Sequence, residues 1–213
     1  MIQYGEPIPV KYFIAILRAQ SRAGGVSPLS AESAELRAEN ASPLSPELLD
    51  RLQHLWGPID YQSQEYPFDQ TDYYREEMGE GLQRSIISFA DLRSPEELPI
   101  TKLHCMNIEA AFARHPPPNS QEAQDVRVIY RTINLDIGYL DHNKIVLASV
   151  KGLGQKIYLS LGIYADLVAR YGHGRYQPFE WTFPDFKEGR YDTDLAHLRQ
   201  QYLEQLKQAR QPH

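Results

Sequence analysis

Apolar and polar positions along the chain repeat with the periods of short strands and helices. Residues 10–17 are apolar on both alternating faces, which is typical of a central strand covered on both sides. Residues 45–56 place leucines at helical spacing, after a serine suited to the cap and a proline suited to the first turn. Further strands are predicted at 59–68, 82–89, 126–136, 144–150, 156–160 and 163–170, and further helices at 99–113 and 191–208.

Up to residue 136 the predicted order of elements is strand, helix, strand, strand, helix, strand. This is the split βαβ order of ferredoxin-like folds. We therefore expect one compact α+β domain, with a ferredoxin-like half over 1–136 that carries a flexible insertion at 22–43, a β-rich extension over 137–190 and a terminal helix over 191–213. Because a ferredoxin-like sheet has its helices on one face, we expect the extension to cover the other face.

Composition excludes several classes of protein. The 213 residues include 22 Lys and Arg against 28 Asp and Glu, a net charge of −6, which argues against binding to nucleic acid through its phosphates. A single cysteine excludes an internal disulfide and a zinc site built from cysteines. The longest apolar run is six residues, far short of the ~20 of a membrane helix. The first residues lack a signal-peptide pattern, so we expect a cytoplasmic protein that does not bind membranes.

Polar side chains on predicted strands are the candidate functional residues. Asn134 and Asp136 point to one face at the end of a strand, where functional side chains often lie. Arg84 alternates with apolar residues, and a buried arginine needs a carboxylate or a phosphate. We expect a polar cleft between the ferredoxin-like half and the extension, lined by Asp69, Arg84, Asn134, Asp136, Lys156 and Tyr158. The structural alternatives are an ion-pair network for the cations and a turn joining Asp136 to Gly138.

Seven segments occur in the order found in a known family. They are 56–60 (WGPID), 66–74 (YPFDQTDYY), 77–79 (EMG), 134–140 (NLDIGYL), 156–159 (KIYL), 162–165 (GIYA) and 181–185 (WTFPD). Together they resemble a prokaryotic family catalogued as domain of unknown function 4416, over nearly the whole chain except 22–43 and the last dozen residues. The resemblance implies a shared fold and little about activity. Ile137 stands where we expect proline, so a less rigid turn is expected there.

A GTP-binding label that some members of that family carry finds no matching motif here. The phosphate-binding sequence G-x-x-x-x-G-K-[ST] is absent, and residues 152–156 (GLGQK) are too short for it. The sequence also contains no nucleophile elbow and no H-E-x-x-H. Because cations and aromatic residues line the expected cleft and no nucleophile or general base is evident, we expect first a binding module for a small anionic ligand such as a nucleotide.

Two other functions stay open. The acidic segment 69–80 suggests a divalent-metal phosphoester enzyme, with Mg²⁺ held by Asp69, Asp72, Glu77 and Asp136. The structural alternative for that segment is a solvated acidic connection between strands. The third function is a protein-interaction scaffold that docks the apolar face of the terminal helix on a partner. The sequence alone gives neither the ligand nor the oligomeric state.

Overall fold

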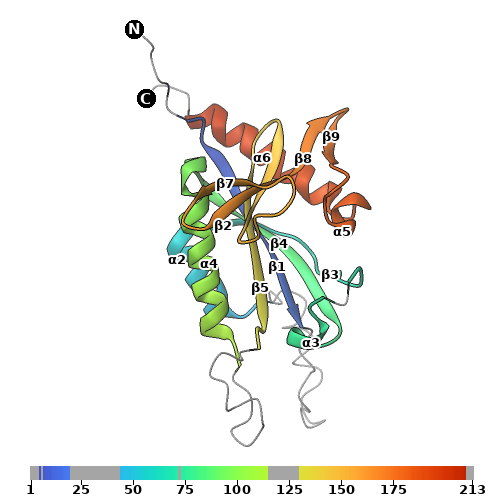
Figure 1. The fold of residues 1–213 in the computed structure, drawn as a ribbon. Helices are drawn as coiled ribbons and strands as arrows, with labels where there is room; N and C mark the ends of the chain where they lie inside the picture. The colour runs from blue at the N-terminus through green and yellow to red at the C-terminus, as the bar shows by residue number, and fades with distance from the viewer. Residues whose placement is uncertain (1–4, 6, 20–43, 72, 115–129, 210–213) are drawn as a thin grey trace, which may run out of the picture.

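The computed structural model describes residues 5, 7–19, 44–71, 73–114 and 130–209, and it is a mixed α+β structure (Figure 1). The insertion predicted at 22–43 and residues 126–129 of a predicted strand lie outside the described residues. Among the described residues, no helix combines the length and the apolar character that crossing a membrane requires.

One nine-stranded antiparallel sheet organises the described chain. Its strands are β1 (Val10–Ala19), β2 (Ile59–Gln62), β3 (Tyr66–Pro67), β4 (Leu82–Arg93), β5 (Ile133–Leu140), β6 (Lys144–Ser149), β7 (Ile157–Ser160), β8 (Ile163–Gly172) and β9 (Arg175–Pro178). The main path runs β2-β4-β1-β5-β6-β8-β7, with β3 paired to β4 and β9 paired to β8. The central position of β1 agrees with its two apolar faces.

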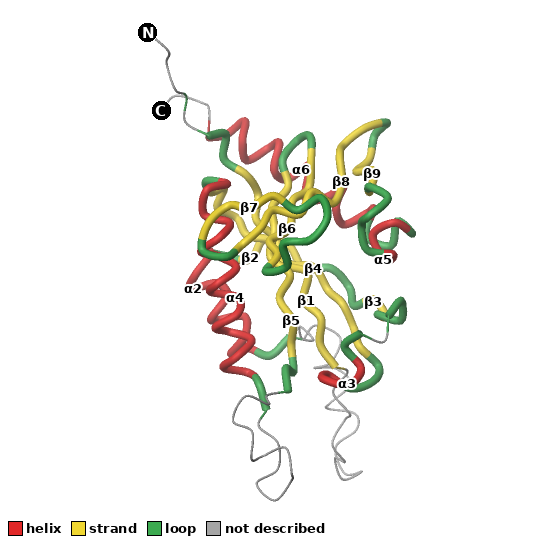
Figure 2. Tube along the Cα trace, viewed as in Figure 1, coloured by secondary structure: helices red, strands yellow, loops and turns green. Residues whose placement is uncertain are grey.

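The helices lie outside this sheet (Figure 2). They are α2 (Pro46–Trp56), α3 (Arg75–Met78), α4 (Leu98–Phe112), α5 (Pro184–Lys187) and α6 (Asp192–Ala209), with a 3₁₀ turn η1 (Pro95–Glu97). The predicted cap of α2 is present, because the Ser45 hydroxyl accepts a hydrogen bond of 3.2 Å from the Leu48 backbone N–H.

Apolar cores form on both faces of the sheet. On one face Tyr12, Ile14 and Ile16 of β1 pack with the buried sides of α2 and α4. On the other face Phe13 and Ala15 pack with the apolar side of α6. The alternation of β1 therefore places helices on both faces of the sheet.

The β-rich extension covers the other face of the sheet only in part. The strands β6, β8 and β7 continue the same sheet beyond β5, and that face is covered by α6 together with Phe186 of α5, which belongs to the extension. At Gly138, where a turn was expected, β5 instead runs on to Leu140. A Cβ at position 138 would collide with the backbone oxygen of Val146, so glycine permits β6 to pair closely there. The turn comes later, where Asp141 Oδ1 accepts hydrogen bonds from the next backbone N–H groups.

The sheet divides on the far side of β5. Pairing between β5 and β6 covers only Gly138–Leu140, and no described strand pairs with that edge of β5 over residues 133–137. The backbone groups of Leu135 on this edge are bound by side chains of α4 instead. This division of the sheet positions the candidate site.

Candidate functional site

A cleft of about 230 Å³ lies where β5 and β6 separate. Its walls come from α4 and β5 on one side, and from β6, β8 and the loop after β6 on the other. Its lining residues are Tyr74, Lys102, Met106, Glu109, Arg131, Asn134, Asp136, Leu147, Ala148, Ser149, Val150, Lys151, Lys156, Asp166 and Phe183. The cleft therefore joins the first half of the chain to the extension.

Two charged side chains of α4 bind the open edge of β5. The Lys102 ammonium donates to the Leu135 carbonyl at 2.9 Å, and Glu109 Oε1 accepts from the Leu135 N–H at 2.6 Å. Both side chains are buried. Burial raises the pKa of Glu109, while the nearby ammonium of Lys102 lowers it. These contacts satisfy the backbone N–H and C=O of Leu135, which would otherwise pair with a neighbouring strand.

Arg131 is held between a carboxylate and an amide at the mouth of the cleft. Its guanidinium donates to both oxygens of Glu77 at 2.6 Å, which raises the pKa of Arg131 and lowers the pKa of Glu77. Its third contact is with Asn134 Oδ1 at 2.9 Å. This contact turns the Asn134 amide so that its oxygen is occupied and its NH₂ group is not.

The Asn134 NH₂ group is buried without an acceptor among the described residues. Buried amide donors in folded proteins nearly always have an acceptor, so such a group marks a place where a ligand oxygen or water belongs.

The opposite wall of the cleft carries two lysines. Lys156 pairs with Asp166 at 3.2 Å and donates to the Ser149 hydroxyl at 2.9 Å. Lys151 is exposed and donates to the Tyr73 hydroxyl at 3.0 Å, which lowers the pKa of that tyrosine. In the described part of the chain, neither Lys151 nor Lys102 has a carboxylate within ion-pair distance. These two ammonium groups keep donors for a ligand.

The six residues expected to line one cleft are only partly brought together. Asn134, Asp136 and Lys156 line it. Arg84 lies behind Asp136, to which it donates at 3.3 Å. Tyr158 is exposed on β7 against Tyr164, away from the lining.

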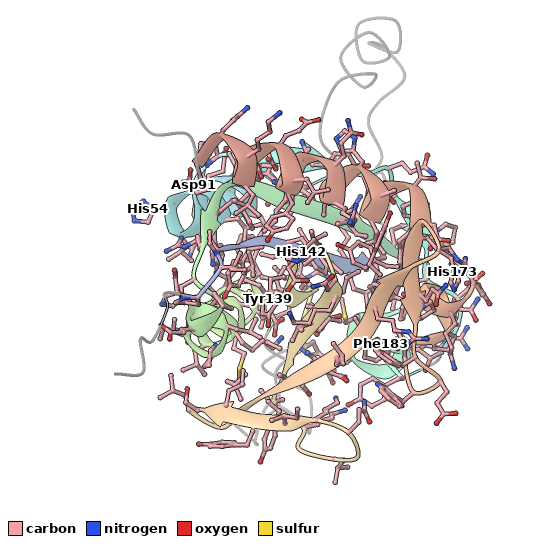
Figure 3. The ribbon with its side chains drawn as sticks, turned by 90° about the horizontal axis from the view of Figure 1, so that it is seen from above. His54, Asp91, Tyr139, His142, His173 and Phe183 are labelled. Atoms are coloured by element: carbon pink, nitrogen blue, oxygen red, sulfur yellow. The ribbon has the colours of Figure 1, made fainter. Side chains whose placement is uncertain are left out.

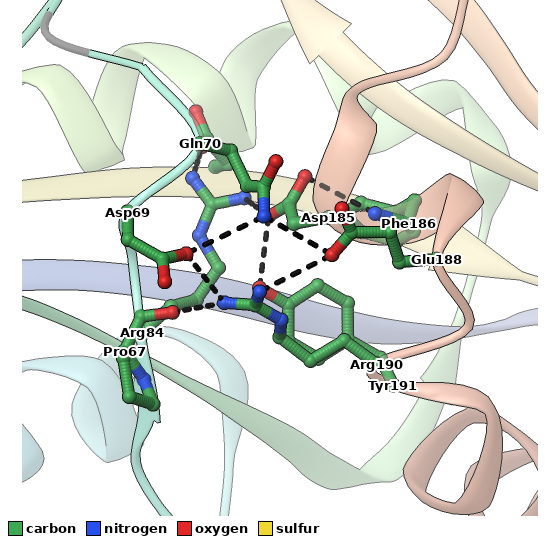
Figure 4. Close-up of polar contacts among 10 residues, drawn as sticks. Pro67, Asp69, Gln70, Arg84, Asp185, Phe186, Glu188, Arg190 and Tyr191 are labelled. Carbon is green, nitrogen blue, oxygen red and sulfur yellow. Dashed lines mark hydrogen bonds and ion pairs between the residues drawn. The ribbon is translucent and has the colours of Figure 1, made fainter.

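Arg84 belongs to a buried ion-pair network (Figure 4). It donates to Asp185 at 2.8 Å, and Tyr191 donates to the same carboxylate oxygen at 2.8 Å. The guanidinium also lies over the ring of Phe68, 4.5 Å from its centroid. Arg84 therefore has its anion within the chain, which agrees with the structural alternative of an ion-pair network.

Asp69 lies in a separate, exposed network. It pairs with Arg190 at 3.1 Å, beside Glu188 (Figure 4). The Arg190 guanidinium also donates to the Pro67 carbonyl. Hydrogen bonding to Arg190 lowers the pKa of Asp69. Asp69 is not a lining residue of the cleft, because the segment after β3 turns toward α5 rather than toward β6.

The expected metal ligands do not converge in the described residues. Asp69 pairs with Arg190, both oxygens of Glu77 are bound by Arg131, and Asp72 lies outside the described residues. No group of three or more His, Cys, Asp or Glu in the described ranges is arranged to hold a metal ion. The histidines that Figure 3 labels, His54, His142 and His173, lie apart from one another.

The terminal helix does not offer the surface that the scaffold function requires. Leu195, Leu198, Tyr202 and Leu206 are buried against the sheet of the same chain. The predicted amphipathic face is therefore part of the protein's own core.

The expected cleft did not include the residues of α4 and α5 in these networks. Lys102 and Glu109 are seven residues apart, which places two charged side chains on the buried side of a helix, and that spacing was the available signal. Asp185 is 101 positions from Arg84, and nothing local indicates that they meet.

Comparison with known proteins settles the family. The family model described as "Domain of unknown function (DUF4416)" matches residues 34–202, which is most of the chain. The chain belongs to this family. The match spans both walls of the cleft, from α4 and β5 to β8 and Phe183. No curated protein and no solved structure matches the chain significantly.

Proposed function

We propose that the cleft between β5 and β6 binds a small anionic ligand such as a nucleotide, and that this cytoplasmic member of the family is a binding module. The observation that carries the proposal is the buried NH₂ group of Asn134, which lacks an acceptor in the described structure and belongs to a lining residue. A phosphate or carboxylate oxygen of a ligand supplies that acceptor.

Charge in the cleft supports the same ligand class. Lys102 and Lys151 reach the cleft from opposite walls without a carboxylate of the described chain in ion-pair distance. A buried ammonium is stabilised by an anion, and an anion placed between two lysines gains from both. Asp136, which Arg84 holds only at 3.3 Å, is available to accept a donor group of the ligand.

The size of the cleft limits what enters. A volume of about 230 Å³ lies below the ~300–1,000 Å³ of sites for drug-sized molecules. We infer that the ligand is small, or that only the charged end of a larger ligand, such as the phosphates of a nucleotide, occupies the cleft.

We also propose that the first part of the chain has the split βαβ arrangement of ferredoxin-like folds. The support is the strand order β2-β4-β1-β5 with antiparallel pairing throughout, together with α2 and α4 on one face. In that arrangement the last strand, β5, is the one whose far edge borders the cleft.

The function is tested by thermal shift and calorimetric titration of the full chain. The probes are inorganic phosphate, pyrophosphate, ATP and GTP, each with and without Mg²⁺. At least one probe raises the melting temperature and gives saturable heat, because a ligand that binds the folded state stabilises it. If no probe binds, the proposal is refuted.

Variants then locate the site. Asn134→Asp keeps an oxygen for Arg131 and replaces the unpartnered donor with a repelling oxygen, so we expect binding to weaken by about tenfold or more. Lys151→Gln removes an exposed charge at the rim and weakens binding without loss of stability. The matched control is Lys207→Gln on the exposed side of α6, which leaves binding unchanged. Equal affinity for all variants would place the ligand elsewhere.

A further inference from the structure

The last strand of the sheet path has an open outer edge. β7 pairs with β8 on one side, and no described strand pairs with its other side. Such an edge presents free backbone N–H and C=O groups, and edge strands are normally protected from other strands by charges, proline or bulges.

β7 has a register irregularity but neither a charge nor a proline to protect its edge. Its pairing with β8 shifts register between Tyr158 and Ser160, and its residues, Ile157–Ser160, are all exposed. Ile157 is 66% exposed and the next residue, Tyr158, is 58% exposed. Neighbouring side chains of a strand point to opposite faces, so apolar surface lies on both faces of this edge.

The turn that ends β7 has an unfavourable residue for its backbone. Leu161 and Gly162 have φ angles of 54° and 76°, which is the pattern of a type I′ hairpin turn. Asn, Asp or Gly suits the first position, because a leucine there is strained by about 1 kcal/mol or more. Leu161 is nevertheless 58% exposed, so its own chain gains little burial from this side chain.

We propose that β7 pairs antiparallel with the β7 of a second copy of this chain, about a two-fold axis. The contact surface is formed by Leu153, Ile157, Tyr158, Leu159 and Leu161, here called the β7 surface. A two-fold pairing brings each strand against itself, and residues 157–162 are uncharged, so no like charges oppose each other.

The exposed area sets an upper limit on the size of this contact. With roughly 200 Å² for a fully exposed large apolar residue, the exposed fractions of the β7 surface leave roughly 600 Å² on each copy. Two copies together would cover at most roughly 1,200 Å², the lower limit of specific protein interfaces, so we expect a weak dimer. Backbone hydrogen bonds between the two edges add to this contact.

The test is the mass of the full chain in solution, measured by light scattering and sedimentation over a range of concentrations. We expect a dimer that dissociates on dilution. Ile157→Lys places two like charges near the two-fold axis and weakens the dimer by about tenfold or more. Ile100→Lys on α4 is the control, because Ile100 is also exposed and apolar but lies outside the β7 surface. It leaves the dimer intact.

Cross-linking gives the register independently of stability. The native Cys105 is fully buried, so single cysteines introduced from 157 to 160 are the reactive thiols. At least one of them forms a disulfide between copies. A monomer at all concentrations, or a dimer that Ile157→Lys leaves intact, would overturn the proposal. A monomer that loses stability on Ile157→Lys would also overturn the proposal, because a segment of the same chain would then cover β7.

Discussion

The ion pair between Arg84 and Asp185 predicts a large stability loss from one substitution. The Arg84 side chain is 4% exposed and that of Asp185 is 1% exposed, so solvent hardly screens the pair. Arg84→Met leaves the Asp185 carboxylate buried with only neutral donors, Tyr191 and a backbone N–H. Removal of one partner from a buried ion pair costs about 3–5 kcal/mol.

This magnitude gives a measurable shift. In a chain of 213 residues each kcal/mol lowers the melting temperature by roughly 2–4 °C. Arg84→Met should therefore lower the melting temperature by roughly 6–20 °C, measured by calorimetry and checked by chemical denaturation.

Two further variants test the role of the buried charge. Arg190→Met breaks the neighbouring, exposed pair with Asp69 and should change the melting temperature far less. Asp185→Asn in the Arg84→Met background removes the stranded charge and should restore part of the loss. A cost below about 1 kcal/mol for Arg84→Met would contradict the importance of this ion pair. So would an Asp185→Asn substitution that restores no stability in the Arg84→Met background.

Three other predictions concern the sheet and the cleft. Gly138→Ala should destabilise the fold by about 2 kcal/mol or more, measured by denaturation, because the added Cβ meets the Val146 backbone; an unchanged midpoint would contradict this. Burial raises the pKa of Glu109 above its ordinary 4.5. Between pH 4.5 and this raised pKa, the folded chain holds a proton that the unfolded chain has released, so the free energy of unfolding should fall as pH rises. Glu109→Gln should reduce that fall. If the variant and the natural chain have identical pH profiles of stability, the raised pKa of Glu109 is contradicted. Cys105 is buried and its thiol pKa is raised, so a thiol reagent should react only after unfolding.

Local patterns were sufficient to predict several elements. The two apolar faces of β1 and the Ser45 cap of α2 are short-range signals, and both elements appear where expected. The role of Gly138 was not readable, because glycine serves both turns and close strand contacts, and only the position of Val146 distinguishes them.

Strand alternation predicted part of the candidate site. The two-residue period places Asn134 and Asp136 on one face, and both line the cleft. Asp69 lies on a connection, where no period fixes the direction of a side chain, and it pairs with Arg190 instead. Lys102 contributes through contacts with a strand edge, which depends on where β6 separates from β5.

The most direct test of the binding proposal is the side-chain NH₂ signal of Asn134 in nuclear magnetic resonance spectra, assigned by its absence in Asn134→Asp. Titration with pyrophosphate or the tightest-binding nucleotide should shift this pair of resonances saturably, in step with the calorimetric affinity, as the ligand oxygen accepts its hydrogen bond. If the ligand binds while these resonances stay in place, the cleft between β5 and β6 is not the binding site.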